Sequence, residues 1–573
     1  MFRRKSYVIL IAFVITAVFC IPFYRSDLFT GLDLTFHLSR IDGLLSATRD
    51  LQFPIAIYPE KNYGFGYASP LFYCDLFLIP AAILYAAHVP LLIVYKIYVF
   101  VIAWIGVIAS LYAMHYFTRR DVLAVFGALL FTFSSYHIND FFIRAALGEA
   151  MAFSLMPLFP VIAHRFFVEE ENNTMELAGF FSLLAVCHLI SFTLCAAVFA
   201  LLILCYIRTF FRNLHWWSFL KAVAIGFCLC AFFLLPMVQQ LRSQKFLFVQ
   251  NRELFGEEIM RRYSNTIFSA LNDYVFSMGY DLESFHYFTG LTVTIAPLLF
   301  LFCRRHDRTH GFMAVLTVVS VLLLIATTDL IPLWRIEILQ SIQFTYRFNI
   351  LIASFLPFVL VYTINSFPKP ARTVLCTLLV LYMGLNTAVI NRQLRRYKQR
   401  TDNLATPAYL FTGDFYENYN NYYNIAELSS GEYLPATHEM NYAENQGSVY
   451  LFETVAPSVT YTRSGTESTL KLNSVNDGFA AIPVTWYLGY EAVRREGREE
   501  VVLPITQEEY TGQIVLPVKA GEYTYEIRYV GTRLQKYSLL LSLVSLLILS
   551  GYLTVKKARS DEAADLEASE KFS

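Results

Sequence analysis

The chain has 573 residues, of which 56% are hydrophobic, and its mean hydropathy is +0.46. Charged residues make up 16%, against about 25% in a typical soluble protein. Because 45 basic residues balance 45 acidic ones, the composition lacks the basic excess that is typical of nucleic-acid binding. Apolar runs long enough to cross a bilayer recur along the chain, and they predict a polytopic α-helical membrane protein.

We predict about twelve membrane spans. The first, 7–23, follows Arg3, Arg4 and Lys5, which should hold its start in the cytoplasm, and no cleavage site follows Cys20. We therefore expect that the first span is not cleaved and that both termini of the chain lie in the cytoplasm. The other spans are expected at 91–117, 121–137, 150–168, 177–188, 191–208, 218–236, 288–303, 311–328, 348–366, 372–391 and 537–555.

The stretch 71–87 allows two topologies. It is apolar enough to span, but it contains Asp75 and Pro80. If it spans, Arg119 and Arg120 lie outside; if it lies in the interface, they stay in the cytoplasm. The positive-inside rule favours the interfacial topology. We therefore predict a transmembrane domain at 1–391 whose first external loop covers 24–90.

The region 392–535 has a different character. Short alternating runs such as 448–454 and 512–518, punctuated by glycine and proline, predict a small β-sandwich or jelly-roll-like domain outside the cytoplasm. The last span and a charged cytoplasmic tail follow at 536–573. All nine cysteines lie in or beside apolar runs and none has metal-ligand spacing, so we interpret them as small hydrophobic residues.

The first external loop opens with the motif Gly31-Leu-Asp-Leu-Thr-Phe-His-Leu-Ser-Arg40. Asp33, His37 and Arg40 stand at i, i+4 and i+7, so a helix would place all three on one face. A carboxylate, an imidazole and a guanidinium would then converge where the chain leaves the membrane. The simpler alternative is an amphipathic helix that lies on lipid headgroups.

More polar residues gather on the same predicted side of the membrane. They are Asn139, Asp140, Arg144 and Glu149 in a second external loop, His188 in a turn between two apolar runs, and Gln343 and Arg347 before a span. Each also has a structural explanation: Arg144 could pair with Glu149, His188 could cap a helix, and Arg347 could be an interfacial anchor. Their location on one predicted side of the membrane favours a functional site, because unrelated interfacial anchors should be found on both faces of the membrane.

These residue types suit one chemistry in particular. The planar fork of arginine matches a phosphate, and a carboxylate or imidazole can activate an acceptor hydroxyl. No nucleotide-binding motif is present. A donor sugar that arrives on a lipid phosphate fits a compartment without nucleotides.

The motif Gly31-x-Asp33-x-x-Phe36-His37-x-x-Arg40 resembles the first-loop motif of the YfhO-like bacterial membrane proteins, also labelled pyruvoyl-tetrahydropterin-synthase-related. Further pieces resemble the same group, namely Arg144 with Gly148-Glu149, His188-Leu-Ile-Ser, and Ile342-Gln-Phe-Thr-Tyr-Arg347-Phe. A β-rich external domain before one last span is also similar. We see no histidine arrangement that suits the zinc of a soluble pterin enzyme.

This group is similar in architecture to the GT-C superfamily, which moves sugars from polyprenyl-phosphate donors to acceptors outside the membrane. The resemblance implies that Asp33 is the base and that Arg40 or Arg347 holds the donor phosphate. Many GT-C enzymes have adjacent acidic residues here, whereas Asp33 stands between Leu32 and Leu34. The cofactor therefore stays unknown: a divalent metal is left open without a clear ligand set.

The leading hypothesis is a glycosyltransferase of a bacterial plasma membrane that modifies a cell-envelope polymer or glycolipid on the extracytoplasmic side. Its expected partners are membrane lipid, a polyprenyl-phosphate sugar and the polymer acceptor, not nucleic acid. The alternatives are a transporter or flippase of lipid-linked saccharides and a non-catalytic scaffold. The candidate residues are Asp33 and His37 for catalysis, and Arg40, Arg144, Glu149, His188, Gln343 and Arg347 for substrate binding.

Overall fold

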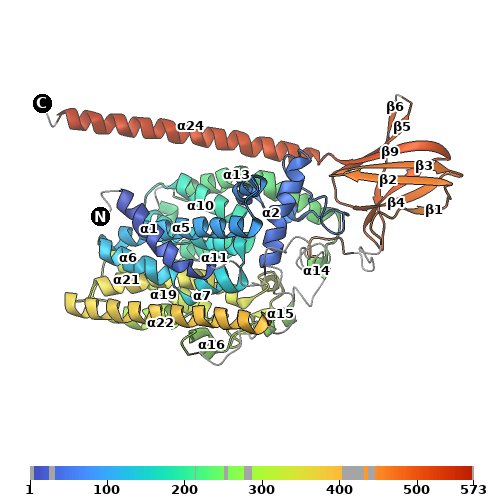
Figure 1. The fold of residues 1–573 in the computed structure, drawn as a ribbon. Coiled ribbons are helices and arrows are strands. Elements are labelled where there is room, and N and C mark those ends of the chain that lie inside the picture. The colour runs from blue at the N-terminus through green and yellow to red at the C-terminus, as the bar shows by residue number, and fades with distance from the viewer. Residues whose placement is uncertain are drawn as a thin grey trace.

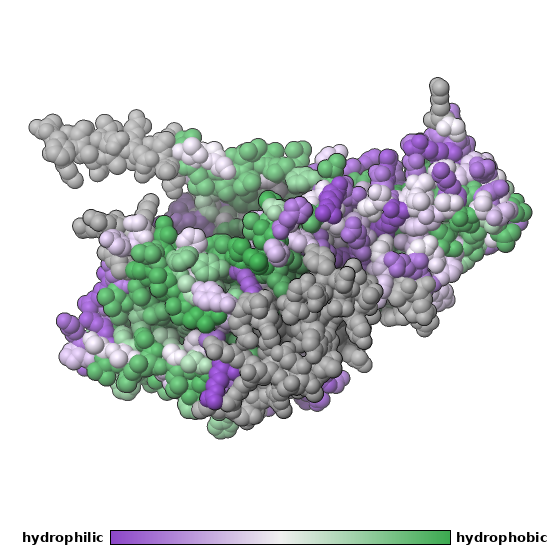
Figure 2. All heavy atoms as spheres, viewed as in Figure 1, coloured by the Kyte–Doolittle hydropathy of each residue, from purple (hydrophilic) through white to green (hydrophobic). Residues whose placement is uncertain are grey.

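The computed structural model describes residues 5–24, 33–212, 215–250, 256–276, 287–402, 431–436, 445–497 and 499–570. A bundle of helices carries a β module at one end (Figure 1). Helix α1 (Lys5–Phe19) begins and helix α24 (Arg533–Glu570) ends at the side of the molecule away from that module (Figure 1). Hydrophobic residues cover much of the bundle surface, whereas hydrophilic residues gather over the module (Figure 2).

Long apolar runs form the helices of the bundle. Within the described residues, six helices are long and apolar enough to cross a membrane, or up to eight if each of two bent pairs is one span. Helix α21 (Asn349–Asn365) is buried along its whole length, so it forms the centre of the bundle. The other long helices are α5 (Leu91–Thr118), α13 (His215–Ser243), α19 (Arg308–Ala326), α22 (Lys369–Asp402) and α24.

Shorter helices fill the rest of the membrane domain, so the expected total of about twelve spans stays a prediction. The apolar ones are α10 (Thr174–Cys187), α11 (Leu189–Cys205), α17 (Leu291–Thr294) and α18 (Ala296–Phe300). The remainder are η1 (Ile21–Phe23), α12 (Ile207–Phe211), α14 (Leu247–Gln250), α15 (Glu257–Arg262), α16 (Ile267–Leu271), η5 (Leu333–Arg335), α20 (Glu337–Gln340) and η6 (Thr345–Phe348).

The two bent pairs correct one prediction. Helix α6 (Asp121–Thr132) is followed, after a bend of 52°, by α7 (Ser135–Ile138) and the π-helical turn η3 (Asn139–Arg144). Helices α8 (Leu147–Leu155) and α9 (Leu158–Phe167) meet at 41°. The residues of the expected second external loop are helical and buried inside the bundle, and the side of the membrane on which they lie stays a prediction. Their charges pair with one another, which lets polar residues occupy the interior.

The ambiguous stretch 71–87 is folded as short pieces and not as one helix. It comprises the end of α3 (Ser69–Phe72), then η2 (Leu76–Leu78) and α4 (Ile79–Ala86). The apolar helical part covers only Leu76–Ala86, which at about 1.5 Å per residue is far shorter than the roughly 30 Å of a hydrocarbon core. This length favours the interfacial topology.

That topology gives a labelling prediction. In a background without accessible native thiols, a cysteine in place of the exposed Arg120 should react with a charged, impermeant maleimide only after the cells are permeabilised. A cysteine at Val455 in the β module, which is 66% exposed, is the matched control and should react in intact cells. Strong labelling of Arg120→Cys in intact cells would make 71–87 a span.

The region between helices α22 and α24 contains a β module, as the alternating runs predicted. Two antiparallel sheets, with strand orders β1-β4-β8-β7 and β2-β3-β9-β5-β6, share one core that includes Leu470, Ile482 and Tyr525. The Tyr/Asn-rich stretch 416–423 lies outside the described residues. The strands are β1 (Tyr450–Phe452), β2 (Ser458–Ser464), β3 (Glu467–Ser474), β4 (Gly478–Thr485), β5 (Tyr490–Glu496), β6 (Glu499–Leu503), β7 (Thr506–Gln507), β8 (Gln513–Val518) and β9 (Gly521–Tyr529).

The β module packs on the segment 50–72, which belongs to the expected first external loop. Ile57 and Phe72 of that loop belong to the same hydrophobic core as the module. The Thr466 hydroxyl donates a hydrogen bond of 2.8 Å to Asp50, and Arg463 donates to the carbonyl oxygen of Gly64. The loop that leads out of helix α2 (Leu34–Arg49) is thereby fixed between the bundle and the module.

Candidate functional site

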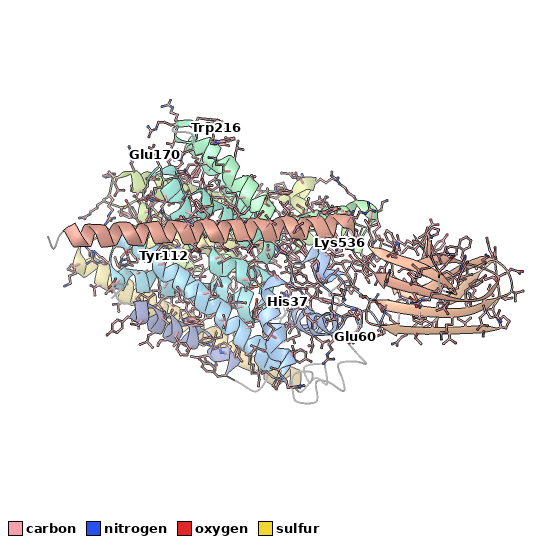
Figure 3. The ribbon with its side chains drawn as sticks, turned by 90° about the horizontal axis from the view of Figure 1, so that it is seen from above. His37, Glu60, Tyr112, Glu170, Trp216 and Lys536 are labelled. Carbon is pink, nitrogen blue, oxygen red and sulfur yellow. The ribbon has the colours of Figure 1, made fainter. Side chains whose placement is uncertain are left out.

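The first-loop motif starts helix α2 and meets the end of the π-helical turn. Asp33 precedes the first residue of α2, and its backbone N–H donates a 2.9 Å hydrogen bond to the carbonyl oxygen of Arg144. Its carboxylate interacts electrostatically with Arg144, Arg347 and Glu149. Residues more than three hundred positions apart in the sequence are therefore brought together at the end of the bundle that faces the β module, where His37 also lies (Figure 3).

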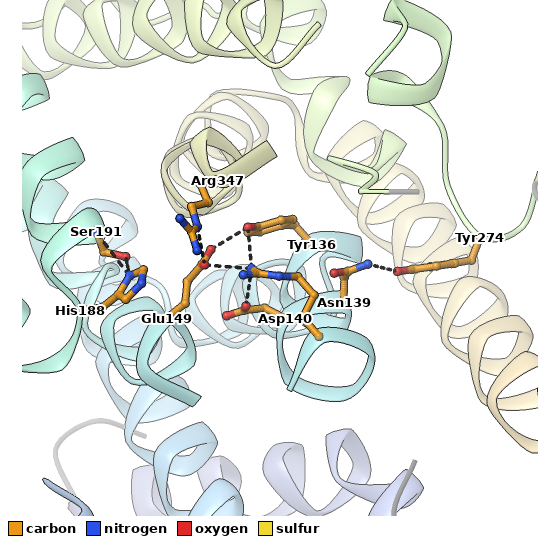
Figure 4. A network of polar contacts seen from close by, with 9 residues as sticks. Tyr136, Asn139, Asp140, Glu149, His188, Ser191, Tyr274 and Arg347 are labelled. Carbon is orange, nitrogen blue, oxygen red and sulfur yellow. Dashed lines mark hydrogen bonds and ion pairs between the residues drawn. The ribbon is translucent and has the colours of Figure 1, made fainter. Parts of the chain in front are cut away.

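Glu149 is the centre of a buried polar network (Figure 4). Arg144 Nη1 donates to Glu149 Oε2 and to Asp140 Oδ1, both at 2.9 Å, and the Tyr136 hydroxyl donates to Glu149 Oε1 at 2.6 Å. Arg347 Nε lies 3.7 Å from Glu149 Oε2. The ion pair between Arg144 and Glu149 that the sequence left open is therefore formed.

Within the described parts of the chain, Arg347 is joined to the network only through the long contact between its Nε and Glu149. Its side chain is 8% exposed, and Nη1 donates to the carbonyl oxygen of Ile342 at 2.8 Å. Its Nε has no hydrogen-bond partner among the described residues. Gln343 is in the turn just before it, with a left-handed φ of 69°. Buried donors usually have a hydrogen-bond partner, and an anionic ligand could accept the hydrogen bond of this Nε–H.

Arg40, in contrast, is occupied by protein groups. Its Nε donates to Asp75 Oδ1 at 2.8 Å, its Nη2 donates to the Cys74 carbonyl oxygen at 3.0 Å, and its guanidinium lies 4.0 Å from the centre of the Tyr73 ring. Its Nη1 lies 3.2 Å from His37 Nδ1, as the shared helix face implied. The phosphate contact expected of Arg40 stays a prediction, and the geometry favours Arg347 for it.

The catalytic candidates of the first loop differ in their basicity. Burial raises the pKa of Asp33 above its ordinary value, although Arg144 and Arg347 act in the other direction. Burial, followed by the positive charge of Arg40, holds the pKa of His37 well below its usual range. A carboxylate with a raised pKa is a stronger base, whereas a neutral His37 is a weak one. This comparison of the two pKa values favours Asp33 over His37 as the proton acceptor.

His188 lies on the other side of Glu149 and begins helix α11 (Figure 4). Its Nδ1 lies 2.8 Å from Ser191 Oγ and also accepts a hydrogen bond from the Ser191 backbone N–H. The helix-capping role that the sequence left open is therefore present. Because Nδ1 accepts from the backbone, the neutral ring carries its proton on Nε2, next to the network.

Tyr73 belongs to this cluster, although the sequence analysis did not select it. Its ring centre is 6.0 Å from that of His37 and 6.2 Å from that of His188. A Cβ on Gly148 would lie 1.7 Å from the Tyr73 hydroxyl oxygen, so only glycine fits beside Glu149. An aromatic residue in an apolar stretch gives no signal by itself, but the Gly148-Glu149 pair marks the place where another chain segment approaches.

Among the described residues, no three His, Cys, Asp or Glu side chains are grouped in a way that could hold a metal ion. The arrangement instead offers a base, Asp33, and a cation with spare donors, Arg347. Arg144 and Glu149 form an ion pair in the same network.

Comparison with known proteins identifies the family. A family model described as "6-pyruvoyl-tetrahydropterin synthase related domain; membrane protein" matches residues 70–394, more than half of the chain and the part that contains Arg144, Glu149, His188 and Arg347. An uncharacterized protein of Lactococcus lactis subsp. cremoris (strain MG1363) is 24% identical over 254 residues, which cover 42% of this chain and 41% of that protein. The chain therefore belongs to the 6-pyruvoyl-tetrahydropterin synthase related family of membrane proteins, as its motifs predicted.

Proposed function

We propose that this protein is a glycosyltransferase that moves a sugar from a polyprenyl-phosphate donor to a cell-envelope polymer or glycolipid outside the cytoplasm. The observation that carries the proposal is the convergence of Asp33 and Arg347 on one buried cluster around Glu149. Asp33 comes from the expected first external loop, and Arg347 comes from the turn η6 that precedes helix α21.

The transfer can be written with these residues. Asp33 accepts the proton of an acceptor hydroxyl, and the freed oxygen forms a bond to the anomeric carbon of the donor sugar. The bond between that carbon and the phosphate oxygen breaks, so polyprenyl phosphate leaves with the extra negative charge. Arg347, whose Nε–H has no hydrogen-bond partner among the described residues, stabilises this charge. Arg144 and Glu149 hold Arg347 and the start of α2 in place.

A transporter of lipid-linked saccharides is the second candidate, and the two bent helix pairs favour it. Discontinuous helices that carry buried ionisable residues are typical of transporters. Here the bends of 52° and 41° flank Arg144 and Glu149. Buried charge at a broken helix also suits an enzyme, so the two functions must be separated by assay.

The decisive assay uses the purified full-length protein in lipid nanodiscs with a panel of radiolabelled polyprenyl-phosphate hexoses and envelope oligosaccharides. Transfer predicts labelled oligosaccharide and an equal amount of released polyprenyl phosphate. The same lipids in proteoliposomes report movement between leaflets. Leaflet exchange without any labelled oligosaccharide would replace the glycosyltransferase proposal with transport.

Arginine-to-lysine exchanges test the assignment of the donor phosphate. Arg347→Lys should lower the rate of transfer about ten- to a hundredfold, because lysine keeps the charge but loses the fork that donates two hydrogen bonds. Donor binding, measured with a non-transferable polyprenyl-phosphonate sugar, should weaken by a similar factor.

Arg335→Lys, at a position exposed to solvent, is the matched control and should leave both quantities unchanged. Wild-type transfer by Arg347→Lys would reduce this arginine to an anchor of helix α21.

A further inference from the structure

A short segment between the membrane domain and the β module reaches the candidate site. Residues 431–436 lie against the chain that follows helix α13 and are held there by backbone hydrogen bonds. The N–H of Leu247 donates to the Leu434 carbonyl oxygen at 3.0 Å, and the N–H of Phe248 donates to that of Glu432 at 3.1 Å. This pairing fixes the backbone of a segment that is distant in sequence from the membrane site.

Tyr433 projects from this segment toward the first external loop. Its ring stacks on Phe72, with centres 5.1 Å apart and planes at 1°. Its N–H donates to the Tyr67 hydroxyl at 3.3 Å, and its carbonyl oxygen accepts from the Tyr487 hydroxyl of the β module at 3.1 Å. Tyr433 also packs in a cluster with Phe36 and Tyr73. Two backbone hydrogen bonds thus hold Tyr433, and its ring packs near Phe36 at the start of α2.

Tyr73 and Tyr433 share two properties that a structural aromatic residue does not need. Both side chains are only half-buried, and neither phenol hydroxyl has a hydrogen-bond partner among the described residues. Tyr433 also interacts electrostatically with Tyr73, Arg40 and Arg347, so both phenols belong to the surroundings of the same cluster. Because both side chains are only half-buried and their hydroxyls are unpaired within the described part of the chain, a ligand that approaches from outside can form hydrogen bonds with both phenols.

We propose that Tyr73 and Tyr433 form a saccharide-binding subsite for the acceptor, beside Asp33 and on the side of the cluster that faces the β module. This inference rests on the proposed glycosyltransferase function. A pyranose ring has an apolar C–H face that packs on an aromatic ring and a rim of hydroxyls that bond to the phenols. A lipid chain would use the rings and leave both hydroxyls without partners.

The subsite gives the β module a role in the reaction. Tyr487 holds the Tyr433 backbone, and the module core includes Phe72, on which Tyr433 stacks. The acceptor would therefore be bound by groups from both halves of the chain, and docking of the module completes the site.

The test measures binding of full-length protein in nanodiscs to an array of oligosaccharides with hexose, N-acetylhexosamine and polyol-phosphate units. We expect wild-type protein to retain at least one saccharide class, and Tyr433→Ala and Tyr73→Ala to weaken its Kd about tenfold. Tyr433→Phe, which keeps the stacking ring, should weaken the Kd less than Tyr433→Ala. Tyr510→Ala, at a position 67% exposed on the module, is the matched control and should bind like wild type.

The outcomes separate this inference from the function on which it rests. No saccharide bound by the wild type, or equal binding by Tyr433→Ala and Tyr510→Ala, would overturn the subsite. Saccharide binding that depends on Tyr433, in a protein that transfers no sugar from any lipid donor, would keep the subsite and overturn the transferase.

Discussion

Asp33→Asn is expected to lower the rate of sugar transfer about 10²- to 10⁴-fold, which is the usual contribution of a general base. Asparagine keeps the size of the side chain but cannot accept the acceptor proton. The backbone N–H of residue 33 still donates to the Arg144 carbonyl oxygen, so the start of α2 should stay in place. The protein should therefore insert and bind donor normally, and only turnover should fall.

The pH dependence of transfer gives a second measure of the same residue. Since burial raises the pKa of Asp33, the carboxylate becomes protonated, and inactive as a base, at a higher pH than an ordinary aspartate. Transfer should therefore decline as the pH falls through this raised pKa, above the usual value of about 3.9. The residual activity of Asp33→Asn should lack that decline.

Asp42→Asn is the matched control, because Asp42 lies on the same helix and pairs with Lys61 at 2.6 Å, away from the network. It should transfer sugar at the wild-type rate. Full activity of Asp33→Asn would remove Asp33 from the mechanism. Failure of Asp33→Asn to fold, with Asp42→Asn folding normally, would show that the Asp33 carboxylate is structural.

The class of protein and its β module could be predicted from the sequence because both depend on local patterns. Apolar runs predict helices for a membrane, and alternation predicts strands, so the bundle and the strands between Tyr450 and Tyr529 agree with the sequence. The spacing of His37 and Arg40 is also local, and α2 does place their side chains side by side.

The interior of the site could not be predicted in the same way. A run such as Asn139–Arg144 reads as a loop because its polarity suits solvent, yet Arg144 is paired on both sides by Asp140 and Glu149 and so can be buried. Arg40 bonds to Asp75 because residues 73–75 fold back on α2, and the spacing of residues in the sequence does not predict this contact. Tyr433 joins the site only through backbone pairing with the chain after α13.

Glu149→Ala is expected to have the largest effect on stability. Glu149 accepts from Arg144 and Tyr136 and lies next to Arg347, and all of these groups are buried. Removal of one partner from a buried pair leaves an uncompensated charge, which typically costs about 3–5 kcal/mol. Asp140 would remain as the counter-ion of Arg144, so the charge left without an ion pair among the described residues would be that of Arg347. The free energy of unfolding, measured by titration of the detergent-solubilised protein with SDS, should fall by roughly this amount.

A double-mutant cycle separates the pair from simple loss of volume. Arg144→Met should be destabilising by a similar amount, because Glu149 then keeps only Tyr136 and the more distant Arg347 as partners. The double variant Arg144→Met/Glu149→Leu removes both charges of the pair and fills the space with apolar atoms, so it should lose less stability than the sum of the single variants. Strict additivity would mean that the two charges do not interact. In that case the network around Glu149 would not be what holds Arg347 in position for a phosphate.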